Sequence, residues 1–193
     1  MLTIISPDKF KQIPWKNGQG TTTELAISEN STLDDFSWRL SIASVVADGQ
    51  FSDFSGYWRN LVLISGDGIA LEHNLNNEIR TDKLTELLQV SSFAGASKTY
   101  GKLVNGNIND FNVMTNIEEH KAEVSTYTNK EKVKIKTCDL CFVYSLANEV
   151  KINNSQQETQ ILPVGHLLKI TTPTIDALSI TGEMMIVVYL FEN

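Results

Sequence analysis

The 193-residue sequence has few cysteines (two), few prolines (four) and few histidines (three), and its 16 basic residues are outnumbered by 23 acidic ones. The scarcity of proline and a hydrophobic content of 41% exclude long disordered tracts. The net charge of −7 argues against nucleic acid or an anionic membrane surface as a partner, because both require a basic patch. The longest apolar run, Met184–Phe191, is far shorter than the roughly 20 residues that span a bilayer. We therefore expect a compact soluble protein that binds neither nucleic acid nor membrane.

The N-terminal sequence MLTIISPDKFKQ lacks the basic segment and long apolar core of a secretory signal peptide. We therefore expect a cytoplasmic protein.

Both cysteines lie in one CDLC sequence, Cys138 to Cys141. A structural zinc site needs four ligands, and neither a second cysteine pair nor a close histidine pair is present. The segment is flanked by strand-like sequence rather than by the helix start of a redox motif. In an extended segment residues i and i+3 point to opposite faces. We predict two reduced, semi-buried thiols.

Short alternating patterns dominate the sequence and predict β-strands. Bulky apolar residues at Phe36, Trp38, Leu40 and Ile42 alternate with small or polar ones, which indicates a half-buried strand. The runs at 61–64 and 69–71 flank the turn-forming sequence Ser65–Gly68 and favour a hairpin. Many short strands separated by turns indicate an all-β sandwich or barrel.

Helical signal is weak. The segment Asp82–Gln89 has an N-cap candidate and leucines at helical spacing, but it could equally be a loop with a strand. Charge rises and hydrophobicity falls near residues 116 to 131. We place a soft boundary there, with an N-terminal half at 1–118 that carries the motifs and a C-terminal half at 119–193, packed as one compact unit.

Several ordered blocks resemble the HutD/Ves family. They comprise Pro14–Gly20 with Thr22 and Glu24, Phe36–Ala43, Asp48–Gly56 with Arg59, Gly66–Gly68, and Asp110–Thr115. The resemblance implies a cupin-like double β-barrel (a bicupin of jelly-roll type) with few short helices. It also implies a genetic association with histidine utilisation, without an established catalytic activity. The sequence departs from the family pattern at Gln50, at Ser55 and at Asn116–Ile117, where a basic pair usually follows Met-Thr.

Metal-dependent cupins bind their metal through an HxH pair, a further histidine and a carboxylate. His73, His120 and His166 are far apart and never in HxH spacing. We expect no metal and no cofactor, and we expect each histidine to be a surface residue or a singly hydrogen-bonded one.

Strand parity groups the candidate binding residues. Thr22, Glu24 and Ala26 share one face of their strand, as do Ser37, Arg39 and Ser41, and likewise Asp110, Asn112 and Met114. If these faces line one barrel mouth, arginine and lysine donors can bind a carboxylate while amides and hydroxyls bind an amide or formyl group. The predicted ligand is a small polar carboxylic acid. Its predicted binding residues are Lys16, Asn17, Glu24, Arg39, Ser41, Arg59, Asp110 and Asn112.

A purely structural interpretation of the same residues stays open. Arg39 could pair with Glu24 across adjacent strands, Arg59 could hold the turn at Asp48–Gly56, and Lys16–Gly18 could be a tight turn.

Three functions remain at this stage. The first is a sensor or accessory protein in histidine catabolism that binds a formyl- or formimino-glutamate-like acid. The second is a metal-independent enzyme acting on such an acid, with Glu24 or Asp110 as proton carrier, because a carboxylate in a partly desolvated barrel can have a raised pKa. The third is an oligomeric scaffold with a vestigial pocket. A homodimer is also open, with the strand at Met184–Phe191 serving either as interface or as core.

Overall fold

The computed structural model describes residues 1–15, 20–154, 158–171 and 178–193. Within these ranges the chain is nearly all β, and its one helix is the short 3₁₀ segment η1 (Pro7–Lys9). The predicted all-β fold with few short helices is therefore confirmed. No helix in the described ranges has the length and apolarity to cross a membrane. The chain divides into a larger unit, Phe10–His120, and a smaller unit that combines Met1–Lys9 with Lys121–Asn193.

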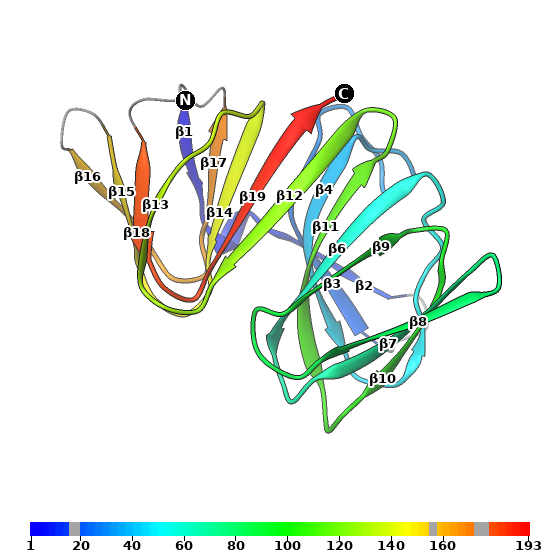
Figure 1. The fold of residues 1–193 in the computed structure, drawn as a ribbon. Helices are drawn as coiled ribbons and strands as arrows, with labels where there is room; N and C mark the ends of the chain where they lie inside the picture. The colour runs from blue at the N-terminus through cyan, green and yellow to red at the C-terminus, as the bar shows by residue number, and fades with distance from the viewer. Residues whose placement is uncertain (16–19, 155–157, 172–177) are drawn as a thin grey trace. The chain divides into compact units, whose positions relative to one another are not determined.

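The larger unit consists of two antiparallel sheets (Figure 1). In spatial order, the six-stranded sheet contains β2 (Lys11–Pro14), β3 (Gly20–Ile27), β4 (Trp38–Val45), β11 (Ile108–Asn116), β6 (Tyr57–Ser65) and β9 (Val90–Ala94). The four-stranded sheet contains β5 (Gly49–Gln50), β10 (Lys98–Leu103), β7 (Ile69–Leu75) and β8 (Glu78–Leu84). A core cluster takes apolar side chains from both sheets, including Leu61, Leu63, Ile69 and Leu71, all fully buried.

The smaller unit also contains two sheets. The five-stranded one has the order β1 (Leu2–Ile5), β17 (Leu167–Thr171), β14 (Leu140–Ser145), β19 (Met185–Glu192) and β12 (His120–Tyr127). The four-stranded one has the order β13 (Glu131–Lys134), β18 (Ser179–Gly182), β15 (Val150–Asn153) and β16 (Thr159–Leu162). The N-terminal residues belong to this unit because β1 pairs with β17, a long-range pairing that no local pattern indicates. β19 is an interior strand of its sheet, and six of its residues are buried.

Strand β4 shows the predicted alternation but is buried on both faces. Trp38 and Leu40 point to one face, and Arg39 and Ser41 point to the other, with exposed fractions of 7% for Arg39 and 4% for Ser41. The alternation alone predicted a half-buried strand. The polar face instead lies inside the larger unit, where it meets polar side chains of β3 and β11 across the sheet.

The predicted hairpin at Ser65–Gly68 is wrong. β6 pairs with β11 and β9, whereas β7 pairs with β10 and β8, so the turn carries the chain from one sheet to the other. Gly66 (φ 90°) and Gly68 (φ 126°) both have positive φ, a conformation that glycine adopts at least cost. A Cβ on Gly68 would lie 2.4 Å from the carbonyl oxygen of Leu84. These glycines therefore permit a crossing between sheets.

The segment Asp82–Gln89 is the strand-and-loop alternative rather than a helix. β8 continues to Leu84, and the chain then turns with Leu88 at φ 69°. The side chain of Gln89 accepts hydrogen bonds from the amides of Thr85 (2.8 Å) and Glu86 (3.2 Å). These bonds close the loop before β9 and so set the position of its first residues.

Candidate functional site

A cavity of about 290 Å³ opens in the larger unit. Its walls come from β2, β3, β4, β5, β6, β11 and the loops beside them, and three kinds of side chain line it. The charged or strongly polar ones are Asp34, Arg39, Arg59 and Asn112; the hydroxyl-bearing ones are Thr22, Ser41 and Ser52; the aromatic ones are Trp15, Phe51 and Phe54. The volume suits a small organic molecule.

Arg39 reaches the cavity from β4 and is already paired with a carboxylate. Its Nε donates a 2.9 Å hydrogen bond to Oε2 of Glu24 on β3, and the side chains are 9% and 11% exposed. The pairing follows from register, because Glu24 lies opposite Ser41, two residues along β4 on the same face. The positive charge of Arg39 is therefore largely compensated within the protein.

Arg59 on β6 has no such partner in the described part of the chain. Its Nη2 donates a 3.1 Å hydrogen bond to Oδ1 of Asn112, its Nη1 lies 3.5 Å from the carbonyl oxygen of Ser52, and its buried Nε makes no hydrogen bond. Burial is the main cause that lowers the pKa of Arg59 to about 10, with the charge of Asp110 opposing it. The group is therefore still a cation at neutral pH.

Aromatic rings surround the Arg59 guanidinium. Its Cζ lies 5.4 Å from the ring centre of Phe51, 5.5 Å from that of Phe54 and 5.1 Å from that of Phe93. Such contacts favour a cation even where water is excluded. Arg59 thus lies in a mostly apolar surround, where an electrostatic contact is stronger than in water.

Asp110 lies behind Asn112 on β11 and is fully buried. Asn112 donates a hydrogen bond from Nδ2 to Oδ1 of Asp110, while no residue that the structure describes hydrogen-bonds Oδ2 of Asp110. Burial raises the pKa of Asp110 to about 7, although Arg59 and Asn112 act in the opposite direction. Arg59, Asn112 and Asp110 therefore form an array joined in series by hydrogen bonds, from a residue that lines the cavity to one that is fully buried.

The structure brings together six of the eight predicted binding residues on one sheet face. Strand register places Glu24 and Asn112 on either side of Ser41, and Met114 between Arg39 and Arg59. Glu24 and Asp110 share this face but do not line the cavity. Lys16 and Asn17 lie outside the described residues. The cavity-lining residue Asp34 was not predicted, because it lies in a loop, where strand parity does not apply.

Ala26 was expected on the face of Glu24, and this prediction is wrong. The pairing of β3 with β4 shifts between Glu24 and Ala26, so Ala26 lies opposite Leu40 rather than Arg39. A bulge of this kind reverses the face of every residue beyond it. Ser37 was expected to share a face with Arg39 and Ser41. It precedes β4, and its hydroxyl donates a hydrogen bond to Glu119.

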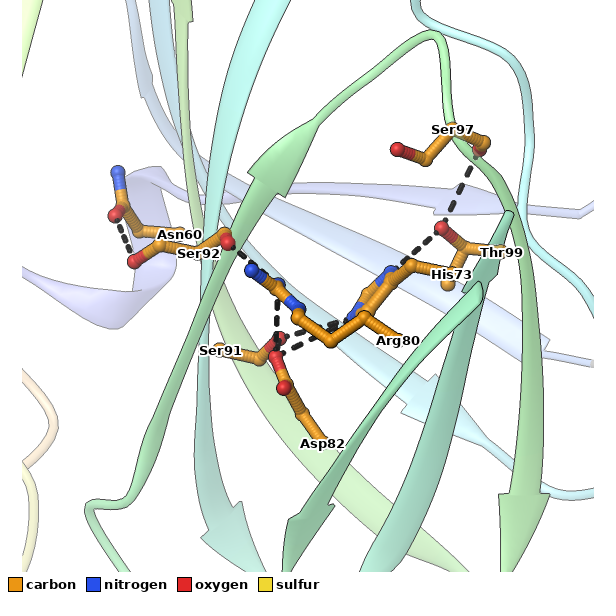
Figure 2. Close-up of polar contacts among 8 residues, drawn as sticks. All are labelled: Asn60, His73, Arg80, Asp82, Ser91, Ser92, Ser97 and Thr99. Carbon is orange, nitrogen blue, oxygen red and sulfur yellow. Dashed lines mark hydrogen bonds and ion pairs between the residues drawn. The ribbon is translucent and has the colours of Figure 1, made fainter. Parts of the chain in front are cut away.

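A second polar cluster surrounds His73 in the larger unit (Figure 2). Nδ1 of His73 lies 2.9 Å from the hydroxyl of Thr99, and Nε2 lies 3.2 Å from the hydroxyl of Ser91 and 3.5 Å from Oδ2 of Asp82. Ser91 donates a 2.5 Å hydrogen bond to Asp82, and Thr99 donates one of 3.3 Å to the carbonyl oxygen of Ser97. His73 is only 4% exposed, so the expectation of a surface or singly bonded histidine is wrong here.

Arg80 and the strand β9 complete this cluster. Nη2 of Arg80 donates hydrogen bonds to Asp82 (2.9 Å) and to the carbonyl oxygen of Ser92 (2.8 Å), and Ser92 donates to Asn60 at 2.7 Å. Burial is the largest influence on His73 and lowers its pKa. The cluster therefore connects β7, β8, β9, β10 and β6, and His73 does not line the cavity at Arg59. Its evident role is to join the two sheets.

In the described ranges no group of three or more histidine, cysteine, aspartate or glutamate side chains could hold a metal ion. The two thiols are free, with Cys141 buried and Cys138 partly so. Cys138 lies outside β14, with a bend at Asp139 between it and the strand, so the extended-strand argument for opposite faces does not apply. Each thiol shifts the pKa of the other: the hydrogen bond between them lowers the pKa of Cys138 and adds to the increase that burial causes in the pKa of Cys141.

Comparison with known proteins gives a consistent result. The model of the HutD family matches residues 7–188. The uncharacterised 21.2 kDa protein of the hutC 3′ region of Pseudomonas putida is 28% identical over 171 residues, which cover 88% of this chain and 86% of that one. Protein Ves of Escherichia fergusonii is 36% identical over 114 residues, which cover 57% of this chain and 56% of that one.

Solved structures agree with these sequence matches. The structure of HutD from Pseudomonas fluorescens SBW25, determined in a formate condition, has a TM-score of 0.81 at 28% identity and covers all of both chains. More distant structures share the fold alone, among them the oxalate decarboxylase of Lactobacillus farciminis (TM-score 0.63, 8% identity, 98% of this chain and 86% of that one). The fold is therefore cupin-like, as the sequence resemblance implied.

Proposed function

Since this chain belongs to the HutD family, we propose that it is a small-molecule binding protein of amino-acid catabolism whose larger unit binds a small organic acid at Arg59. The single observation that supports this function most is the state of Arg59. It is a buried cation on the cavity wall, it has a free Nε donor, and no described carboxylate makes a salt bridge to it. A guanidinium in a desolvated site is a strong binder of carboxylates.

The charges around the cavity favour one carboxylate bound inside it, at Arg59. Arg39 is compensated by Glu24, so Arg59 is the one cavity-lining cation of the described residues that lacks a carboxylate in contact. Asp34 adds a negative charge to the lining, which disfavours a second carboxylate. The remaining lining is hydroxyl, amide and aromatic, which suits a formyl or amide group on the rest of the ligand.

The family context supports an accessory role in histidine catabolism. The relative from Pseudomonas putida is named for its position beside hutC, and the family resemblance links such genes to histidine utilisation. An intermediate of that pathway, such as a formyl- or formimino-glutamate, has one carboxylate for Arg59 and an amide-like group for the polar lining. Its second carboxylate would have to lie outside the cavity, because the described lining offers no second uncompensated cation. We propose that the protein senses or buffers such an acid.

Binding is better supported than catalysis. A general acid or base must come within about 3 Å of the reacting group, but Glu24 is engaged with Arg39 and Asp110 is fully buried away from the cavity lining. Neither carboxylate is placed to transfer a proton to a molecule in the cavity. The site is therefore built to hold an anion.

A ligand screen by thermal shift tests this function. Sodium formate, N-formylglutamate and formiminoglutamate would each be added to the whole protein, then to Arg59→Met and to the matched control Arg80→Gln, which removes an exposed arginine of the same unit (56% exposed side chain). A ligand at 100 times its Kd stabilises the protein by about 2.7 kcal/mol. We expect a shift for at least one acid in the unmodified protein and in Arg80→Gln, and none in Arg59→Met. Absence of a shift with every acid, or an equal shift in Arg59→Met, would refute the proposed function.

A further inference from the structure

In the array Arg59–Asn112–Asp110, the side-chain amide of Asn112 lies between the guanidinium of Arg59 and the carboxyl group of Asp110. Asn112 accepts from Arg59 at 3.1 Å and donates to Asp110, so it bridges the two groups. Among the charged side chains of the described residues, the charge of Arg59 alone shifts the pKa of Asp110, and the charge of Asp110 alone shifts the pKa of Arg59. The flanking register partners of Asp110 are Ala43 on β4 and Leu63 on β6, both apolar. Asp110 is therefore the internal counter-charge of Arg59.

The surroundings of Asp110 make its ionised form costly. The residue is 0% exposed, and its Oδ2 has no hydrogen-bond partner among the described residues. A buried carboxylate with one unsatisfied oxygen depends on a nearby positive charge to stay ionised. The pKa of about 7 that results means that small changes at Arg59 change the protonation state near neutral pH.

We propose that binding of a carboxylate at Arg59 is coupled to the uptake of one proton by Asp110, so that the bound anion replaces Asp110 as the counter-charge of the guanidinium. This inference rests on the proposed function. The ligand neutralises the cation that stabilises ionised Asp110 and adds a negative charge on the far side of Asn112. Both effects favour the protonated acid, and the proton comes from solvent.

The coupling is reciprocal, as any linkage between two binding equilibria must be. Protonation of Asp110 leaves Arg59 uncompensated and so strengthens anion binding. Affinity for a carboxylate then falls as the pH rises above about 7, by up to about tenfold per pH unit. Below that pH it is level, since a ligand carboxylic acid with a pKa of about 4 or less stays ionised down to pH 5.5. A sensor of this kind reports acid concentration and proton concentration together.

The test titrates ¹³C-formate into the whole protein from pH 5.5 to pH 9 at constant ionic strength and follows the formate resonance by NMR. We expect Kd to be level at low pH and to increase above pH 7 in the unmodified protein. Asp110→Asn, a neutral isostere of the protonated acid, should bind formate with the same low-pH affinity at every pH. His73→Gln is the control variant. It removes an imidazole whose ring centre lies 4.3 Å from that of Phe93, a residue that also contacts Arg59. The pH dependence of Kd should persist in this variant if Asp110, and not His73, is the group that takes up the proton.

A second measurement needs no variant. Formate mixed with the unmodified protein in weakly buffered solution at pH 7.5 should raise the pH, because protons are taken up on binding. Formate binding without proton uptake, or an unchanged pH dependence in Asp110→Asn, would overturn the coupling while leaving the binding function intact. If formate fails to bind at every pH, the acids of the thermal-shift screen replace it as probes. Failure of all of them overturns the proposed function itself.

Discussion

Arg39 and Glu24 form an ion pair on adjacent strands of the larger unit, with 2.9 Å between Nε and Oε2 and about one tenth of each side chain exposed. The pair has two consequences. It fixes the β3 strand against β4 just before the bulge at Glu24–Ala26, and it removes Arg39 from competition for an anionic ligand. Breaking it should therefore affect both stability and binding.

The first prediction concerns stability. Glu24→Gln should lower the free energy of unfolding by about 3 kcal/mol, because it leaves a mostly buried guanidinium without a counter-charge. Urea denaturation followed by intrinsic fluorescence measures the loss. The matched control is Glu123→Gln, which breaks an exposed pair with Lys136 (3.1 Å, side chains 42% and 57% exposed) and should cost less than about 1 kcal/mol. Equal decreases in the free energy of unfolding in the two variants would show that burial of the Arg39–Glu24 pair does not increase its contribution to stability.

The sequence predicts correctly those residues of the site that share one uninterrupted strand. Asp110, Asn112 and Met114 lie on one face because β11 pairs regularly with β4 over that stretch, so parity alone places them. The same argument fails for Ala26, where one bulge intervenes. The possible pairing of Arg39 with Glu24, left open by the sequence, is observed because register puts the two strands side by side.

Residues that meet through tertiary contacts leave no local signal. The partners of His73, namely Asp82, Ser91 and Thr99, come from three other strands at separations of 9 to 26 residues. Nothing in the sequence pairs a lone histidine with two distant hydroxyls. The turn at Ser65–Gly68 is a similar case, because its glycines permit both a hairpin and a crossing between sheets, and only the packing of β7 against β10 and β8 decides between them.

The second prediction concerns Asp110 in the ligand-free protein. Burial raises its pKa to about 7 from an ordinary value of 3.8, so the unfolded chain releases this proton at lower pH than the folded one. The contribution of Asp110 to stability is therefore fully present below pH 4 and is lost as the pH rises through 7, by at most about 1.4 kcal/mol per pH unit. Asp110→Asn should show no such loss, and its free energy of unfolding should exceed that of the unmodified protein at pH 8 by more than at pH 5. A difference that is independent of pH would contradict the raised pKa.

The third prediction concerns the thiols. The pKa of Cys138 is lowered mainly by its interaction with the Cys141 thiol, whereas burial raises the pKa of Cys141 well above its usual value. Reaction follows the thiolate and its exposure. A thiol-reactive disulfide reagent should therefore titrate one cysteine in the native protein and two after unfolding. Cys138→Ser should abolish the native reaction, and Cys141→Ser should retain it; two equivalents from native protein would refute this assignment.

The fourth prediction concerns His73, whose pKa is lowered chiefly by burial, with the charge of Asp82 opposing and the charges of Arg80 and Arg59 reinforcing the shift. A lowered pKa means that the unfolded chain takes up this proton first on acidification. The contribution of His73 to stability is therefore complete above pH 6.5 and is lost as the pH falls through the folded-state pKa. NMR of the imidazole, assigned by comparison with His73→Gln, should show a neutral ring at pH 7 that protonates only below pH 6.5. Asp82→Asn should lower the midpoint further, and Arg80→Gln should raise it. Shifts of the opposite sign would mean that hydrogen bonding to Ser91 and Thr99, and not charge, sets the protonation state of this histidine.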